Sequence, residues 1–320
     1  MNKIKVVVMD QDIFAGEYVP YLGSLEPLKA MGCEFTAYPG APAPSMEERY
    51  ERIKDADIVV FGLYEIPNEI LEKCKNLKAV AFFGVGYQSM IDEAYCQSRG
   101  IPIFNTPNYG MNTVAEYAFG LAMALCRKTC MADRRWRSGV WSQDGLEGRE
   151  IRGQTFGVAG TGAIGALVAE KAHLLGANVI AHDLYPSERL IKAYGIKYVS
   201  LEELFATSDI VSLHLAIHPT TNGIVTKALI DSMKQDAIFI NTARSSVMQD
   251  EYRHVLKRIA DGTLYGAAMD VFDEEPVPDW AGYDFENVIA TPHIGYLTGN
   301  AMGNTLVIAC ERIAAFLKER

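Results

Sequence analysis

The stretch "TFGVAGTGAIGALVAEKAHLLGANVIAHD", residues 155–183, decides the fold. A short apolar run leads into the glycine-rich turn 160–165, a helical pattern follows as far as Gly176, and a second apolar run ends at Asp183. The three glycines of the turn permit a tight bend, a close approach of the backbone to a ligand, and close packing of helix on strand. The order of strand, glycines, helix, strand and acid is far more specific than a lone glycine-rich turn.

This order predicts a dinucleotide site. The helix that starts after Gly162 offers free N–H groups and the positive end of its dipole to a pyrophosphate. Asp183 is placed to accept both hydroxyls of a ribose and to repel a 2′-phosphate, and the next residues, 184–186, include no arginine. NAD is therefore favoured over NADP. The residues expected to bind it here are Gly160, Gly162, Ala163, Ile164, Gly165 and Asp183.

Short β-branched runs alternate with helical patterns along the rest of the chain, which predicts parallel sheets with helices on both faces. We expect an α/β protein of two doubly wound parallel-sheet domains, because 320 residues exceed one ordinary core. One is a Rossmann NAD-binding domain and the other a smaller, flavodoxin-like substrate domain. Expected strands are 3–10, 34–38, 57–63, 78–83 and 102–104 in the first part, then 155–160, 177–182, 209–215, 237–241, 265–271 and 288–291.

The domain boundary is expected near "NTPNYGMNT", residues 105–113, where Pro and Gly precede a long helix over about 113–128. The final helix, 300–319, has no strand after it, so we expect it to return to the first domain. The expected domains are 1–107 plus 296–320 for substrate, and 108–295 for NAD. A polar, aromatic arm, "ADRRWRSGVWSQDGLEGREIRG", follows the long helix at 132–153.

Composition excludes several classes of protein. With 49% hydrophobic and 22% charged residues, the chain has the make-up of a globular protein, and a net charge of −10 argues against a nucleic-acid partner. No apolar stretch is long enough to span a bilayer. The six cysteines form no Cys-x-x-Cys pair, which fits a reducing compartment, so cytoplasm is the expected location. No metal site is expected either, because His214 and His218 lack a third ligand.

Four further motifs stand in order along the chain: "INTAR" at 240–244, "GAAMDVFDEEP" at 266–276, "TPHIG" at 291–295, and "TPNYGMNTVAEYAFGLAMAL" at 106–125. With the glycine turn, they resemble the D-isomer-specific 2-hydroxyacid dehydrogenase family over essentially the whole length. Glyoxylate or hydroxypyruvate reductase and phosphoglycerate dehydrogenase without its regulatory domain are the similar types. The resemblance implies an NAD-dependent oxidoreductase that acts on a CH–OH donor and forms a homodimer through the long helix and the arm.

The resemblance also implies a catalytic set of Arg244, Glu275 and His293. All three follow expected parallel strands, at whose carboxyl ends open α/β sheets bind ligands. Arg244 offers a permanently charged fork to a carboxylate or a polarised carbonyl. His293 can donate a proton to the carbonyl as hydride arrives, while Glu275 holds its tautomer and stabilises the imidazolium.

Other roles come from the resemblance alone. "FFGVGYQ", residues 82–88, is similar to the loop whose N–H groups meet the substrate carboxylate, which implies substrate binding by Val85, Gly86 and also Arg244. A strand-to-helix turn is the plain alternative for that loop. Residues at positions similar to those lining the nicotinamide are Thr113, Thr242, Ala243 and Asp270, each of which could equally be a capping or core residue.

Three departures affect the choice of substrate. Ser245-Ser246 stands where the family commonly has two glycines, and a Cβ is unwelcome wherever glycine served a positive φ. Either the turn differs or the hydroxyls contact a ligand. The loop 84–92 is one residue longer than usual, and Ala216 replaces a frequent proline.

The leading interpretation is an NAD-dependent dehydrogenase for a small 2-oxoacid and D-2-hydroxyacid pair, of the glyoxylate or hydroxypyruvate type. The alternative is an NAD(H)-sensing regulatory protein on the same scaffold, against which the complete trio argues. A methyltransferase would leave Arg244, Glu275 and His293 unexplained, and formate dehydrogenases resemble a His–Gln rather than a His–Glu pairing.

Overall fold

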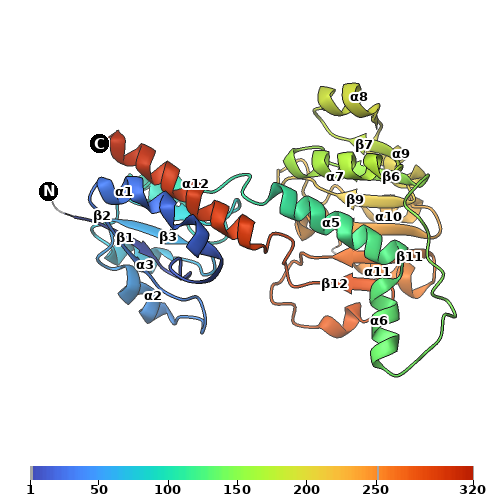
Figure 1. Ribbon diagram of the computed structural model, residues 1–320, viewed down its shortest axis with the longest axis horizontal. Coiled ribbons are helices and arrows are strands. Elements are labelled where there is room, and N and C mark those ends of the chain that lie inside the picture. Colours follow the sequence, from blue (N-terminus) through green and yellow to red (C-terminus); the bar gives the residue numbers. More distant parts are fainter. Residues whose placement is uncertain (1–2, 251, 320) are drawn as a thin grey trace. The chain divides into compact units, whose positions relative to one another are not determined.

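The computed structural model describes residues 3–250 and 252–319; residues 1, 2, 251 and 320, which the expected domain ranges include, lie outside the described residues. The chain divides into two compact units (Figure 1). Unit 1 comprises Met1–Gly110 and Leu297–Arg320, and unit 2 comprises Met111–Tyr296. No helix in the described ranges is long and apolar enough to cross a membrane.

Unit 1 is built on a five-stranded parallel sheet of order β2-β1-β3-β4-β5. All four residues of both β3 and β4 are buried, as expected for central strands covered on both faces. The C-terminal helix α12 packs along η1 and reaches β4 and β5, so the chain's end completes this unit (Figure 1). The elements are β1 (Ile4–Val8), η1 (Gly16–Leu25), α1 (Glu26–Ala30), β2 (Cys33–Ala37), α2 (Met46–Ile53), β3 (Ile58–Phe61), α3 (Asn68–Lys73), β4 (Ala79–Phe82), α4 (Glu93–Ser98), β5 (Ile103–Phe104) and α12 (Gly299–Lys318).

Unit 2 is built on a seven-stranded parallel sheet of order β12-β11-β10-β9-β6-β7-β8. The chain runs outward from β6 in one direction and returns to β9 on its other side, so the strand order reverses between β6 and β9. Such a reversal opens a crevice at the carboxyl ends of the strands, where ligands bind. The elements are α5 (Met111–Cys126), α6 (Thr129–Arg137), β6 (Thr155–Ala159), α7 (Ala163–Leu174), β7 (Asn178–His182), α8 (Glu188–Tyr194), β8 (Lys197–Tyr198), α9 (Leu201–Thr207), β9 (Ile210–Leu213), α10 (Lys227–Ser232), β10 (Ala237–Asn241), η2 (Ser245–Val247), α11 (Arg253–Ala260), β11 (Leu264–Met269), η3 (Trp280–Tyr283) and β12 (Val288–Ala290).

Two hydrophobic clusters cover the two faces of the unit 2 sheet. One joins residues of α5, α7 and α8 to the strands, and the other joins residues of α9, α10 and α11. Gly157 in β6 allows the second layer to come close, because a Cβ there would lie 2.2 Å from the Ser208 hydroxyl and 2.8 Å from Leu204. The doubly wound α/β architecture predicted from the alternating pattern is confirmed.

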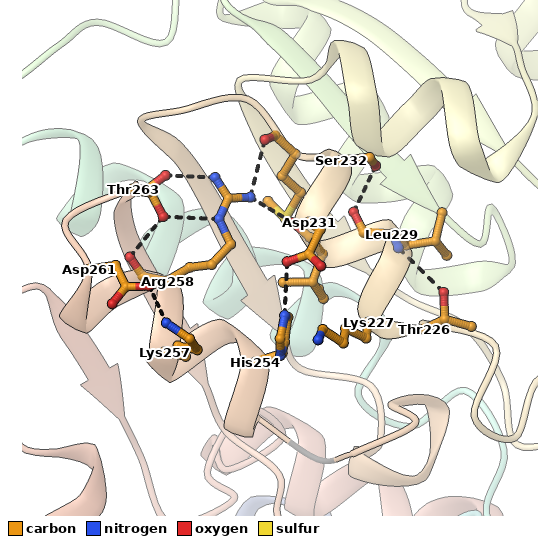
Figure 2. A network of polar contacts seen from close by, with 12 residues as sticks. Thr226, Lys227, Leu229, Asp231, Ser232, His254, Lys257, Arg258, Asp261 and Thr263 are labelled. Carbon is orange, nitrogen blue, oxygen red and sulfur yellow. Dashed lines mark hydrogen bonds and ion pairs between the residues drawn. The ribbon is translucent and has the colours of Figure 1, made fainter.

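A polar network stabilises the amino-terminal edge of this sheet (Figure 2). The Arg258 guanidinium donates to the carbonyl oxygens of Ile230, Met233 and Lys234 and to both oxygens of Thr263, at 2.6–3.3 Å. Arg258 thereby satisfies carbonyls at the end of α10 and holds the turn that precedes β11. Nearby, His254 Nε2 contacts Asp231 Oδ1 at 2.8 Å, so α10 and α11 are joined twice.

Some elements differ from those expected. The long helix ends at Cys126, because Lys128 takes a left-handed φ of 53° and separates α5 from α6. The sequence pattern also predicts a helix around 20–31, but the structure has a 3-10 segment followed by a short α-helix there, and Pro20 lies inside the 3-10 segment. The two-residue edge strand β8 was not predicted, since its pattern is too short to be periodic.

Candidate active site

The glycine turn of residues 160–165 joins β6 to α7 at the point where the strand order reverses. Gly160 has a φ of 91°, and a Cβ there would lie 2.6 Å from the His214 carbonyl oxygen. A Cβ on Gly165 would lie 1.9 Å from the Gly160 carbonyl oxygen. Around Gly162, by contrast, no described atom lies within 4 Å of an added Cβ. Packing therefore requires glycine at positions 160 and 165, while Gly162 leaves open space beside the start of α7.

Asp183 lies against this turn, as the sequence predicted it should if it serves a ribose. Its Oδ2 accepts hydrogen bonds from the Thr161 N–H at 2.6 Å and the Thr161 hydroxyl at 3.2 Å, and its Oδ1 accepts from the Tyr185 N–H at 2.9 Å. These contacts fix the carboxylate next to the glycine turn. The next two residues, Leu184 and Tyr185, have uncharged side chains that are 70% and 85% exposed. Neither therefore places a positive charge beside the Asp183 carboxylate.

The described residues fit a bound dinucleotide. No side chain caps the N-terminus of the 12-residue helix α7, so its first N–H groups remain available to a pyrophosphate. At the end of β10, the Thr242 hydroxyl is buried and has no hydrogen-bond partner among the described residues. A buried hydroxyl without a partner is costly, and a ligand group could satisfy it.

The three candidate catalytic residues follow three neighbouring strands. Arg244 comes after β10, Glu275 after β11 and His293 after β12, and these strands pair in parallel in the order β12-β11-β10. Carboxyl ends of parallel strands meet at one edge, so all three residues leave the sheet on the side of the glycine turn.

Glu275 and His293 are in direct contact. His293 Nδ1 lies 2.7 Å from Glu275 Oε2, and Glu275 Oε1 accepts a hydrogen bond from the Phe272 N–H at 2.8 Å. Since an ionised carboxylate only accepts, Nδ1 carries the proton and Nε2 is the free end of the ring. The two side chains are about one-third exposed, so a substrate can reach them (36% for His293 and 34% for Glu275).

The loop that carries His293 is held by Asp270, which is 2% exposed. The Asp270 carboxylate accepts hydrogen bonds from the Thr291 hydroxyl at 2.7 Å, the Ile294 N–H at 2.9 Å and the Gly295 N–H at 2.8 Å. His293 itself has a φ of 53°, a left-handed conformation that a non-glycine residue adopts only at a cost. Asp270 thus stabilises the loop on both sides of the histidine.

A buried asparagine shapes the turn that carries Arg244. Asn241 donates through Nδ2 to the Arg244 carbonyl oxygen at 3.0 Å and accepts the Ala243 N–H through Oδ1 at 2.9 Å. The Tyr252 hydroxyl receives a second Asn241 N–H at 3.1 Å and donates to the Val271 carbonyl oxygen at 2.7 Å, which ties this turn to the segment after β11. Sequence reasoning noted the "INTAR" motif but missed this role of its asparagine.

The serines that replace the usual glycines need no unusual backbone. Ser245 and Ser246 begin the 3-10 segment η2, and neither has a positive φ among the described residues. The Ser245 and Ser246 carbonyl oxygens accept the N–H groups of Met248 and Gly223 at 2.8 Å. The turn therefore accommodates a Cβ at both positions.

The remaining candidate residues are distributed over both units. Thr113 lies in the first turn of α5 in unit 2, while Val85 and Gly86 lie in unit 1, in the exposed loop after β4. His214 contacts the Ser212 hydroxyl at 2.9 Å, and burial lowers its pKa to about 3. His218 contacts the Thr220 hydroxyl at 2.9 Å. Both histidines thus have structural partners within their own segment.

Comparison with known proteins gives a consistent result. The sequence profile described as "D-isomer specific 2-hydroxyacid dehydrogenase, NAD binding domain" matches residues 119–295, more than half of the chain.

Similar proteins cover nearly the whole chain. A glyoxylate reductase of Korarchaeum cryptofilum is 34% identical over 85% of this chain and 83% of its own length. A hydroxypyruvate reductase of Blautia hydrogenotrophica is 30% identical over 98% of this chain and 97% of its own. Among solved structures, a D-lactate dehydrogenase from Aquifex aeolicus, complexed with NAD and lactic acid, matches with a TM-score of 0.79 and 28% identity, covering 98% of this chain and 96% of that one.

Proposed function

Because the chain belongs to the D-isomer specific 2-hydroxyacid dehydrogenase family, we propose that Arg244, Glu275 and His293 are the catalytic set of an NAD-dependent enzyme. The protein is an oxidoreductase of the 2-oxoacid and 2-hydroxyacid class. The observation that carries the assignment of the set is the 2.7 Å contact between His293 Nδ1 and Glu275 Oε2, which leaves Nε2 free at the ligand-binding edge of the sheet.

When bound, NADH supplies the hydride that reduces the carbonyl carbon, and NAD accepts it in the reverse direction. The residues of the chain supply the proton and the orientation. His293 Nε2 donates a proton to the carbonyl oxygen, and the negative charge of Glu275 stabilises the imidazolium that carries this proton. Arg244 pairs with the substrate carboxylate or the polarised carbonyl through its guanidinium fork. Oxidation of the hydroxyacid runs through the same groups in reverse.

The cofactor is NAD, and we assign its pyrophosphate to the glycine turn. Gly162 gives room for the backbone approach, and the uncapped start of α7, residues 163–165, supplies N–H groups. Asp183 accepts the ribose hydroxyls and repels a 2′-phosphate. The Thr242 hydroxyl and the neighbouring Ala243 serve the nicotinamide, with Thr113 near the start of α5. Asp270 is 2% exposed, whereas Asp183 is only half-buried, and its three donors belong to the loop that carries His293. We therefore assign Asp270 to positioning His293 rather than to a direct cofactor contact.

The substrate is a 2-oxoacid. The small acids of the expected type, glyoxylate and hydroxypyruvate, are the first to test because two relatives are named for them. The test is NADH oxidation against a panel of 2-oxoacids, with NADPH run alongside. Turnover of at least one 2-oxoacid that His293→Ala removes would support the catalytic assignment. Tight NADH binding without turnover of any 2-oxoacid would instead favour an NAD(H)-sensing protein that regulates a partner.

We further propose that unit 2 (expected as 108–295) is the cofactor domain and that unit 1 (expected as 1–107 plus 296–320) binds substrate, through the N–H groups of Val85 and Gly86. A location in the cytoplasm fits six cysteines, none of which is in a disulfide in the described structure.

We also propose a homodimer. None of the residues of α6 is buried, and apolar side chains around it are exposed: Trp136 by 64%, Val140 by 49% and Trp141 by 90%. Exposed patches of this kind mark interaction sites. A mass from light scattering at micromolar concentration that equals one chain would contradict this proposal, and Trp141→Ser should shift a dimer toward that mass.

A further inference from the structure

Three neighbouring strands of unit 1 end in loops that present apolar side chains to solvent. β1, β3 and β4 lie side by side in parallel, so the loops after them leave the same edge of the sheet. These loops expose Phe14 by 45%, Leu63 by 46% and Val85 by 47%. One such residue would be ordinary, but three on adjacent loops at the ligand-binding edge of an open α/β sheet call for an explanation.

The conformation of the Leu63 loop is fixed by a buried acid. Asp10, which is fully buried at the end of β1, accepts the N–H groups of Gly62 at 3.0 Å, Leu63 at 2.8 Å and Tyr64 at 2.9 Å. The N–H groups of these three residues are therefore occupied. An anionic ligand finds no free N–H on residues 62–64, and the side chain that these residues expose most is the isobutyl group of Leu63.

The next loop has the opposite character. Among the described residues, the N–H groups of Val85 and Gly86 donate to no protein acceptor, and the Val85 carbonyl oxygen accepts Asn105 Nδ2 at 3.0 Å. Free N–H groups of this kind suit a carboxylate. A substrate whose carboxylate binds at residues 85 and 86 would place its remaining atoms beside the apolar side chains of the same edge.

Charge at this edge disfavours a second anionic group. The loops 9–17, 62–66 and 83–90 contain no lysine or arginine, while Asp12, Glu17 and Glu65 add negative charge. Two guanidinium groups of helix α2 reach these loops, but backbone acceptors already engage both: Arg52 donates to the carbonyl oxygens of Met9 and Pro39, and Arg49 to those of Pro44 and Glu65. A phosphate would have to displace these contacts and would meet repulsion from the three carboxylates.

We propose that the preferred substrates are 2-oxoacids with an apolar, aliphatic or aromatic side chain, which packs on Leu63 and Val85, and that phosphorylated 2-oxoacids are rejected. This inference rests on the proposed function and adds the substrate class to it. Each buried methylene group favours the larger substrate, so selectivity should grow with the size of the apolar group.

The experiment compares kcat/KM with NADH for glyoxylate, hydroxypyruvate, 2-oxoisocaproate, phenylpyruvate and phosphohydroxypyruvate. We expect the two apolar substrates to exceed glyoxylate by roughly tenfold or more, and phosphohydroxypyruvate to be the poorest. Leu63→Ser should lower kcat/KM for 2-oxoisocaproate roughly tenfold more than for glyoxylate. The matched control is Leu174→Ser, an exposed leucine at the end of α7 remote from the glycine turn, which should leave the ratio unchanged.

The outcomes separate the two proposals. If no 2-oxoacid is turned over, the proposed function fails. If glyoxylate or phosphohydroxypyruvate is preferred while the enzyme is active, the function stands and the substrate class is overturned. An equal loss for 2-oxoisocaproate and glyoxylate in Leu63→Ser would also overturn it, because Leu63 would then act on the fold and not on the side chain of the substrate.

Discussion

Asp270→Asn tests how the catalytic loop is held. The aspartate is 2% exposed, and its two oxygens accept three hydrogen bonds from residues on either side of His293. Asparagine has nearly the same shape, but it has one acceptor oxygen in place of two and carries no charge. Either the Gly295 N–H or the Ile294 N–H must then face an amide NH2 group.

The expected magnitude follows from these contacts. One hydrogen bond to a charged group is lost, worth about 1.5–3 kcal/mol, and the others weaken because the acceptor is now neutral. His293 also needs support for its φ of 53°, a conformation that costs an unsupported residue about 1–2 kcal/mol. We therefore expect a stability loss of roughly 2–4 kcal/mol and a loop that leaves the catalytic conformation.

The assay separates positioning from stability and from cofactor binding. For Asp270→Asn we expect kcat to fall roughly tenfold to hundredfold, since each ~1.4 kcal/mol of lost alignment is tenfold. The Kd for NADH, measured by fluorescence, should change far less. Asp209→Asn is the matched control: Asp209 also accepts a backbone N–H, that of Thr155 at 2.7 Å, but at the opposite edge of the sheet. It should lose stability and keep its kcat.

Two results would refute this reasoning. If Asp270→Asn keeps its kcat within about twofold while losing as much stability as Asp209→Asn, the aspartate does not position the histidine. If the Kd for NADH rises by the same factor as kcat falls, Asp270 contacts the cofactor directly.

Four other changes have defined outcomes. Glu275→Gln removes the charge beside His293 and should lower kcat roughly tenfold or more, with the Kd for NADH nearly unchanged; an unaltered kcat contradicts the pairing. Asp183→Ala should reduce the preference for NADH over NADPH in kcat/KM by about tenfold, and a constant ratio would remove its ribose role. Arg258→Met breaks the network of Figure 2 and should lower the free energy of unfolding by about 2–4 kcal/mol without changing KM. Burial lowers the pKa of His214 to about 3, so below pH ~6.5 the unfolded chain binds the extra proton, and stability should fall by up to about 1.4 kcal/mol per pH unit, a slope that His214→Asn should lack.

The features that the sequence predicted well are those with a local cause. Gly160 and Gly165 are required by contacts within a single strand–turn–helix unit, and a residue pattern shows such a unit directly. Buried parallel strands such as β3 and β10 read as continuous apolar runs, which places them within a residue or two. The separation of α5 from α6 at Lys128 has no comparable sequence signal, because neither glycine nor proline occupies the left-handed position.

Contacts between distant segments could not be predicted. Asn241 and Tyr252 hold the Arg244 turn, yet each would pass for an ordinary strand or helix residue. The same holds for Asp10, whose hydrogen-bond partners lie more than fifty residues away along the chain, in the loop after β3. In each case the sequence shows that the residue is polar, but only the fold shows which backbone groups form hydrogen bonds with it.

The left-handed conformation of His293 is supported by residues outside its own motif. A residue at φ 53° between a proline and an isoleucine is disfavoured on its own, and the segment 291–295 has no side chain that would offset this locally. The offset comes from Asp270, which directly follows the neighbouring strand β11 and accepts hydrogen bonds from the N–H groups of both residues after the histidine. Glu275, six residues after the same strand, binds the imidazole itself. The segment after β11 therefore fixes both the backbone and the ring of His293. A shift of β11 relative to β12 would disturb the backbone contacts of Asp270 and the imidazole contact of Glu275 together. This explains why Asp270 and Glu275 lie on one loop. It also predicts that substitutions in the β11–β12 contact will lower kcat by a larger factor than they weaken the affinity for NADH.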